Sequence, residues 1–196
     1  MRDNGEARVT RISKFGAIGS GETVWKRAIL CLAALVLGGA APDPVAPLLL
    51  RGDGLSGAGG GKAVTLHFGV PRLAAIASLI KLLGKPRSVR TVPDCGQGAP
   101  MVLAAFGAGL TAQFLKGKFS GWSLDAQADP RFRTPEGIRI GSSRAEVLKA
   151  YPDADIDDGS LGVMFTRDAG PSGFLDSMKP GARVTGLYAG ETCMIS

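Results

Sequence analysis

Residues 137–148 read Gly-Ile-Arg-Ile-Gly-Ser-Ser-Arg-Ala-Glu-Val-Leu, and this stretch indicates how the second half of the chain begins to fold. Either Ser142 or Ser143 can cap a helix. Glu146 follows Ser143 by three residues, which is the spacing of a capping box. Pro152 ends the predicted helix, because proline has no backbone N–H to donate. The apolar positions of this helix are Ala145, Val147, Leu148 and Tyr151.

The first half shows a similar order. It opens with residues 64–68 (Val-Thr-Leu-His-Phe), and a helical pattern follows over residues 71–83. Pro71 suits the first helical turn, and Gly84 suits the position just past the end. The apolar residues recur at steps of three and four residues at Leu73, Ile76, Ile80 and Leu83.

Each predicted helix is followed by short strand patterns separated by glycine and proline turns. These strand patterns cover residues 101–106, 110–115, 119–124, 162–166, 173–177 and 184–189. The sequence therefore predicts an α+β fold with two tandem units, each a helix followed by a three-stranded antiparallel meander. The units span residues 63–125 and 136–196 of a single domain, 63–196.

A resemblance follows from these patterns. The helix start at residues 137–148, followed by a meander, resembles the exported domains of the SmpA/OmlA outer-membrane lipoproteins. Two such units in tandem resemble the β-lactamase-inhibitor protein fold. The chain also resembles small uncharacterised exported bacterial proteins that carry a paired cysteine. The resemblance implies that the protein binds or scaffolds through a sheet face.

The region before this domain predicts export. Lys26 and Arg27 precede an apolar run over residues 28–37, which small residues follow up to Ala41. This order is typical of a secretory signal peptide over residues 24–40, with cleavage between Ala40 and Ala41. The apolar run is too short to span a bilayer. We therefore expect a periplasmic or secreted protein.

Two interpretations of residues 1–23 stay open, because a signal peptide is expected at the start of a chain. The natural start can be Val24, so that residues 1–23 are not translated. Alternatively, these residues form a long polar segment that is removed with the signal peptide. Residues 41–62 are rich in proline and then glycine, and this composition predicts a flexible linker.

Charge argues against a nucleic-acid partner. Residues 1–40 hold six of the 23 basic and three of the 17 acidic residues, so the remaining chain carries a net charge of +3 rather than +6. Such a small excess is not the basic footprint of a nucleic-acid-binding protein. We expect instead a protein or an envelope component as partner, no cofactor, and no membrane-spanning segment.

The cysteines predict one disulfide. Cys31 leaves with the signal peptide, which leaves Cys95 and Cys193. Two cysteines in an exported protein most simply pair with each other. The alternative is a pair of free buried thiols. A metal site is disfavoured, because His67 is the only histidine and the set falls short of four ligands.

Three further patterns suggest functional sites. His67 is a candidate base for a secreted hydrolase, with Ser120 or Ser123 as the nucleophile. Aspartates at every second position over residues 153–158 resemble the front of a calcium loop, although the glycine and the last ligand do not match. Trp122 and Tyr188 occupy corresponding strands. Such aromatic residues more often pack in the core or on a sheet face, but exposed ones would suit a protein-binding face, so the two form a possible interaction face. The function that we expect is an exported, non-catalytic binding or scaffolding module.

Overall fold

The computed structural model describes residues 47–193, so the predicted signal peptide lies outside the described residues. The strands of this part of the chain are β1 Leu49–Arg51, β2 Gly54–Gly59, β3 Lys62–His67, β4 Ser88–Val92, β5 Met101–Ala105, β6 Leu110–Leu115, β7 Lys118–Leu124, β8 Asp155–Gly159, β9 Gly162–Thr166, β10 Ser172–Leu175 and β11 Val184–Gly190. The helices are α1 Arg72–Leu83 and α2 Arg144–Ala150, with a short 3₁₀ helix at Gly107–Gly109.

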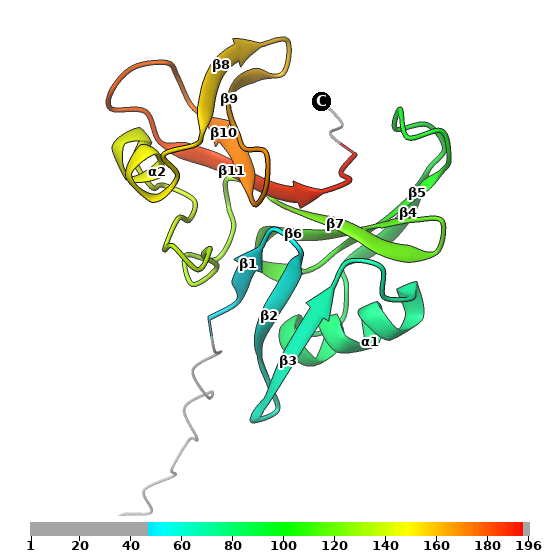
Figure 1. The fold of residues 1–196 in the computed structure, drawn as a ribbon. Helices are drawn as coiled ribbons and strands as arrows, with labels where there is room; N and C mark the ends of the chain where they lie inside the picture. The colour runs from blue at the N-terminus through cyan, green and yellow to red at the C-terminus, as the bar shows by residue number, and fades with distance from the viewer. Residues whose placement is uncertain (1–46, 194–196) are drawn as a thin grey trace, which may run out of the picture. The chain divides into compact units, whose positions relative to one another are not determined.

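The prediction of an α+β fold with helix-plus-three-strand units is wrong. The structure is mostly β, with 43% of the described residues in strands and 15% in helices. The strands form an antiparallel sheet of three, in the order β1-β2-β3, and an antiparallel sheet of eight, in the order β4-β5-β6-β7-β11-β10-β9-β8 (Figure 1). Pairing of β7 with β11 joins two four-stranded meanders into one continuous sheet.

The predicted meanders lack their outermost strands. The sequence patterns for β5, β6, β7, β9, β10 and β11 are confirmed within a few residues, whereas β4 and β8 were not predicted. Both are edge strands with exposed, charged side chains, Ser-Val-Arg-Thr-Val in β4 and Asp-Ile-Asp-Asp-Gly in β8. Such sequences resemble loops, because an edge strand needs no apolar face and often carries charges.

The linker prediction for residues 41–62 is also wrong where the structure describes them. Residues 49–59 form β1, a turn and β2; β1 pairs with β2, and β2 pairs with β3. Leu50 and Leu55 are fully buried, so this segment contributes to the core. Its glycines allow close packing rather than flexibility: a Cβ atom at Gly54 would overlap the backbone oxygen of Leu66 in β3. The folded unit therefore begins before residue 63.

Helix α1 is confirmed, but it is rotated relative to the predicted apolar face. It buries Ala75, Leu79 and Leu82 and packs against β2, β3 and β7. Leu73 is 78% exposed, because it lies on the opposite side of the helix. None of the helices in residues 47–193 is long and apolar enough to cross a membrane.

The capping box of α2 is confirmed. The Ser143 hydroxyl accepts a hydrogen bond from the Glu146 backbone N–H at 3.2 Å, and a Glu146 carboxylate oxygen accepts one from the Ser143 backbone N–H at 2.6 Å. The Ser143 hydroxyl also donates to the same carboxylate oxygen at 2.8 Å, and the backbone and side-chain hydrogen bonds from Ser143 lower the pKa of Glu146. The helix has only seven residues, so its start depends on this cap.

Replacing Ser143 by alanine is expected to lower the free energy of unfolding by about 1 kcal/mol, because the backbone N–H of Glu146 then loses its acceptor, the Ser143 hydroxyl. Urea unfolding followed by circular dichroism measures the change. Ser160→Ala, at an exposed serine in the β8–β9 turn, is the matched control and leaves the midpoint unchanged. Equal midpoints for both variants would contradict a stabilising role for the cap.

The two faces of the large sheet differ. Ala112, Trp122 and Leu124 lie on one face, where Trp122 and Leu124 are opposite Ala189 and Leu187 of β11, which are also buried. Thr111, Ser123 and Tyr188 are cross-strand neighbours on the other face and are only half-buried. The main core therefore lies between the first face and the elements packed on it, where Phe114, Phe119, Tyr151 and Phe165 are also buried.

Candidate functional site

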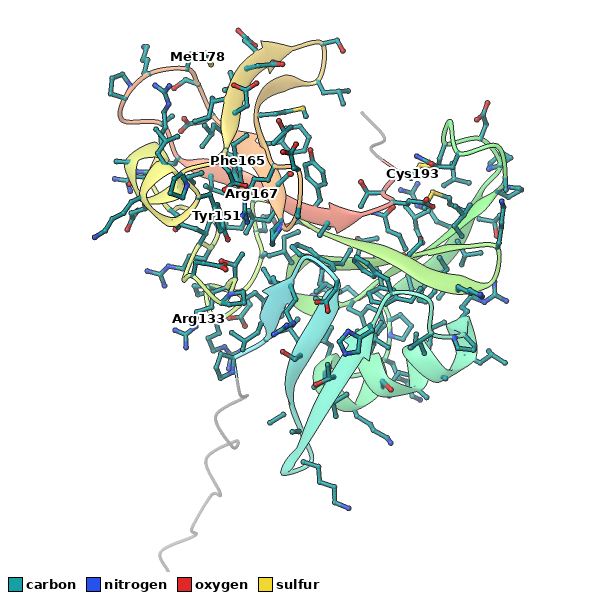
Figure 2. The ribbon with its side chains drawn as sticks, viewed as in Figure 1. Arg133, Tyr151, Phe165, Arg167, Met178 and Cys193 are labelled. Carbon is teal, nitrogen blue, oxygen red and sulfur yellow. A yellow bond between two sulfur atoms is a disulfide. The ribbon has the colours of Figure 1, made fainter. Side chains whose placement is uncertain are left out.

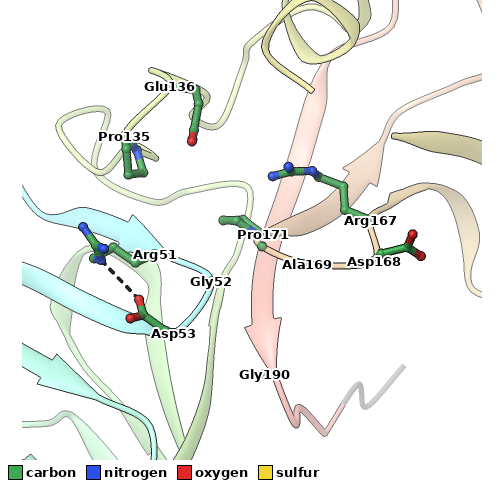
Figure 3. A pocket seen from close by; sticks show the side chains of 11 residues that line it. Arg51, Gly52, Asp53, Pro135, Glu136, Arg167, Asp168, Ala169, Pro171 and Gly190 are labelled. Atoms are coloured by element: carbon green, nitrogen blue, oxygen red, sulfur yellow. Dashed lines mark hydrogen bonds and ion pairs between the residues drawn. The ribbon is translucent and has the colours of Figure 1, made fainter. Parts of the chain in front are cut away.

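A polar cavity of about 660 Å³ opens where three turns meet (Figure 3). The β1–β2 turn contributes Arg51 and Asp53, a loop before α2 contributes Glu136, and the β9–β10 loop contributes Arg167 and Asp168. Five charged side chains from three separate segments therefore converge on one cavity.

Two glycines bring the walls of the cavity together. A Cβ atom at Gly52 would lie 2.5 Å from the Gly170 Cα, so the β1–β2 turn and the β9–β10 loop are in backbone contact. Gly170 has φ of 109°, a conformation that favours glycine. Its own Cβ would lie 2.6 Å from Nη1 of Arg167. A side chain at either glycine would therefore displace the β9–β10 loop or the arginine.

Arg167 is held from two sides. Its guanidinium carbon lies 4.1 Å from the centre of the Tyr151 ring, a cation–π arrangement. Its Nε donates to the Asp153 carboxylate at 3.1 Å, and this hydrogen bond is the main cause of the lowered pKa of Asp153. Only 17% of the Arg167 side chain is exposed. Figure 2 shows Arg167 and Tyr151 side by side near α2. The guanidinium therefore keeps one orientation.

Tyr151 also orients Glu136. Its ring is buried, and its hydroxyl lies 2.6 Å from Oγ1 of Thr134 and 3.0 Å from Oε2 of Glu136. A carboxylate can only accept, so the hydroxyl donates to Glu136. Burial is the main reason that the pKa of Tyr151 is raised, so the hydroxyl keeps its proton. One tyrosine thus positions a carboxylate through its hydroxyl and a guanidinium through its ring.

The opposite wall carries a second set of charges. Nε of Arg51 donates to Oδ1 of Asp53 at 3.1 Å, and Nδ1 of His67 lies 3.1 Å from Oδ2 of Asp53. Burial alone would raise the pKa of Asp53, but the Arg51 hydrogen bond and charge, with smaller contributions from its own backbone and from His67, bring the pKa below its ordinary value. Asp53 is therefore a carboxylate at neutral pH.

The structure places the predicted interaction residues on opposite faces. Tyr188 pairs with Ser123, whereas Trp122 pairs with Ala189, so the two aromatic side chains point to different sides of the sheet. Trp122 is fully buried, and its Nε1 donates to the backbone oxygen of Arg51 at 2.9 Å. Trp122 therefore holds a wall of the cavity and packs in the core, which is the alternative role, and it is not part of an exposed face.

Tyr188 remains half-buried on the other face. Its ring centre lies 5.7 Å from that of Phe174. Burial raises the pKa of Tyr188, while a hydrogen bond with Ser172 acts in the opposite direction.

On the same face, a disulfide joins Cys95 to Cys193, which confirms the predicted pairing. The backbone N–H of Cys193 donates to the side-chain oxygen of Gln113, which pairs with Gly121 on this face.

The predicted catalytic residues are not assembled. His67 has an orienting carboxylate in Asp53, but the candidate nucleophiles bond elsewhere. The Ser120 hydroxyl donates to the backbone oxygen of Gln113 at 3.2 Å, and the Ser123 hydroxyl accepts from the Gln113 amide at 3.2 Å. Among the described residues, the predicted nucleophiles Ser120 and Ser123 therefore have hydrogen-bond partners other than the His67–Asp53 pair.

The aspartates at 153–158 do not form a calcium loop. Asp155, Asp157 and Asp158 belong to β8, where successive side chains point to opposite faces. Asp153 is bonded to Arg167. Among the described residues there is no group of three or more His, Cys, Asp or Glu side chains placed to hold a metal ion.

The sequence patterns did not identify Tyr151, Glu136 or Arg167 as residues of a common site. Tyr151 was predicted only as an apolar position of a helix, and nothing in the spacing of Glu136 and Arg167 connects them.

The fold and site define a mostly β, disulfide-bonded protein with a polar cavity. No protein-family model, curated protein or solved structure matches this chain.

Proposed function

We propose that the protein is an exported, non-catalytic binding module whose ligand site is the polar cavity at Arg51, Glu136 and Arg167. The ligand is a component or a protein segment of the envelope that carries a carboxylate and an ammonium group. Both signs of charge line the cavity, so a ligand with both signs leaves fewer charges unpaired than a ligand with one.

The orientation of Arg167 is the observation that carries the proposal. Arginine binds carboxylates through its planar fork, and an arginine that is already held in place loses less entropy on binding. The Tyr151 ring and Asp153 hold Arg167, and both contacts leave its terminal nitrogens at the cavity wall. Glu136 extends into the same space (Figure 3) and would receive the ammonium group.

The disulfide supports export. Disulfides form and persist in oxidising compartments, and small exported domains use them to supplement a limited core. The pairing of Cys95 with Cys193 joins the segment between β4 and β5 to the segment after β11. A periplasmic or secreted location is therefore part of the proposal.

Replacing Arg167 by methionine is expected to weaken binding about 10- to 100-fold, because a charge-assisted hydrogen bond contributes about 1.5–3 kcal/mol. The probes are glycine, acetate and ethylammonium, titrated into ¹⁵N-labelled protein and followed by NMR. Glycine, which carries both charges, is expected to shift the amides of residues 134–137 and 167–171 more than either single-charge probe. Arg133→Met, at an exposed arginine outside the cavity, is the matched control and retains the wild-type response.

Fractionated envelope material from the producing organism extends the same titration to natural ligands. Shifts that cluster at the cavity and vanish in Arg167→Met support the proposal. Shifts confined to other surfaces, or shifts that persist in the variant, would place the binding site elsewhere and refute it.

A secreted hydrolase that uses His67 is the second candidate, and the His67–Asp53 hydrogen bond is the observation that favours it. Hydrolysis of a panel of esters and peptides, compared between the wild type and His67→Gln, tests it. Activity that disappears in the variant would support the hydrolase. Activity that is equal in both would remove this candidate.

A further inference from the structure

The eight-stranded sheet ends in two edge strands of opposite charge. β4 is one edge and β8 is the other, and they lie at opposite ends of the sheet (Figure 1). β4 carries Arg90 at its centre, and Arg87 lies directly before it. β8 carries Asp155, Asp157 and Asp158.

Both edges are exposed along their length. Four of the five residues of β4 are exposed, and so are four of the five residues of β8. Val89 in β4 is an exposed apolar residue, with 55% of its surface accessible. Unpaired edge strands offer their backbone N–H and C=O groups to another strand.

The topology permits the sheet to continue into a second copy. Every neighbouring pair in the sheet is antiparallel, and the number of strands is even. The two edge strands β4 and β8 therefore run in opposite directions. A second copy placed beside the first in the same orientation puts its β4 antiparallel to β8. The alternation of the sheet continues across the contact, with equivalent faces on the same side.

The two edges also match in length and register. Both strands have five residues, and full antiparallel overlap places Arg90 opposite Asp157. Asp155 is then the diagonal neighbour of Arg90, within reach of a long side chain. On the other face, Asp158 lies directly opposite Val89, and Ile156 becomes the diagonal neighbour of Val89 and covers part of its exposed surface. Pairing of the backbones thus brings opposite charges together and covers part of an apolar side chain.

Symmetric contacts are disfavoured by the same charges. Pairing of β8 with β8 would place aspartates against aspartates, and pairing of β4 with β4 would place arginines against arginines. Like charges directly opposite each other on neighbouring strands are destabilising. The charged edges therefore select the contact between unlike edges, which is heterologous and does not close on itself after two copies.

We propose that copies of this chain associate head to tail, with β4 of one copy adding to β8 of the next to extend the eight-stranded sheet. The occupant of each edge is the opposite edge of another copy. The contact involves one pair of short strands, so the association is weak and depends on concentration. It also depends on salt, because the Debye length falls from about 30 Å at 0.01 M to about 3 Å at 1 M ionic strength.

The test is sedimentation velocity on the full chain as its host produces it, over a concentration series at low and at high salt. The wild type is expected to show a weight-average mass that rises with concentration and falls when salt is added. Arg90→Glu and Asp157→Arg are each expected to weaken association about tenfold or more, because each replaces an attractive pair by a repulsive one. Both positions are exposed, and circular dichroism verifies that each variant is folded.

The decisive measurement combines the two changes. The double variant R90E/D157R carries the opposite pair and is expected to associate again. A mixture of the two single variants is also expected to associate, because each edge of one then finds a complementary edge on the other. A wild type that stays monomeric at the highest soluble concentration in low salt would overturn the proposal. Association that is unaffected by either single variant would overturn it as well.

Hydrogen exchange locates the contact independently of the charges. Protection that appears with rising concentration is expected in residues 88–92 and 155–159 and not at the cavity. Protection confined to other strands would assign the association to another surface and refute the edge contact. Cavity variants such as Arg167→Met leave the association unchanged, so the outcome is independent of the proposed ligand site.

Discussion

Replacing Trp122 by alanine is expected to lower the free energy of unfolding by about 3–5 kcal/mol, the range for large aromatic residues removed from a core. Trp122 is fully buried, and its cross-strand neighbours Ala112 and Ala189 are too small to fill the space. The variant also leaves the Arg51 backbone oxygen without its donor, the Trp122 indole N–H. Urea unfolding of the folded fraction measures the loss.

Trp122→Phe separates packing from hydrogen bonding. It keeps most of the ring but removes the N–H, so we expect a smaller loss of about 1–3 kcal/mol, as for a buried acceptor left unsatisfied. Because Arg51 lies in a wall of the cavity, NMR shifts in Trp122→Phe are expected to extend into the β1–β2 turn. An alanine variant as stable as the wild type would mean that Trp122 is not in the core.

Removing the disulfide is expected to be comparably costly. The Cys95→Ser/Cys193→Ser double variant is expected to lose about 2–5 kcal/mol of unfolding free energy. The bond closes a long loop, with a sequence separation of 98 residues, so its loss releases a large conformational freedom in the unfolded chain. The C-terminal segment that hydrogen-bonds to Gln113 is then no longer covalently held to the sheet.

Reductant supplies the control for the disulfide. Dithiothreitol is expected to shift the urea midpoint of the wild type toward that of the double variant and to leave the variant unchanged. Two equal midpoints in the wild type, with and without reductant, would contradict a stabilising disulfide. Protection of the backbone N–H of residue 193, which donates to the Gln113 side chain, reports in both proteins whether the C-terminal segment remains in place.

Local sequence patterns predicted strand bounds correctly where a run of buried apolar residues is bounded by turn residues. Strands β6 and β9 have the predicted bounds, because alternating or continuous apolar residues are bounded by glycine turns. The capping box at Ser143 and Glu146 needs only neighbouring residues, and it formed as predicted. The edges β4 and β8 were missed, because what makes them strands is the neighbouring strand and not their own side chains.

The candidate site was far less predictable. Tyr151 directly follows α2, Glu136 lies in the loop before α2, and Arg167 directly follows β9. Only folding brings these three side chains together. The prediction that Trp122 and Tyr188 share a face failed for a similar reason. It assumed that corresponding strands present corresponding faces, whereas β7 and β11 pair directly with Trp122 opposite Ala189.

From the amino-acid sequence alone we predict the cysteine pair, the two helices, six of the strands and the near-neutral charge of residues 41–196. These features depend on counting, on periodicity and on contacts between close neighbours in the chain. Three further features are visible only once the chain is folded: the single eight-stranded sheet, the contribution of residues 49–59 to the core, and the polar cavity. Those features depend on pairing between distant segments, which local patterns do not specify.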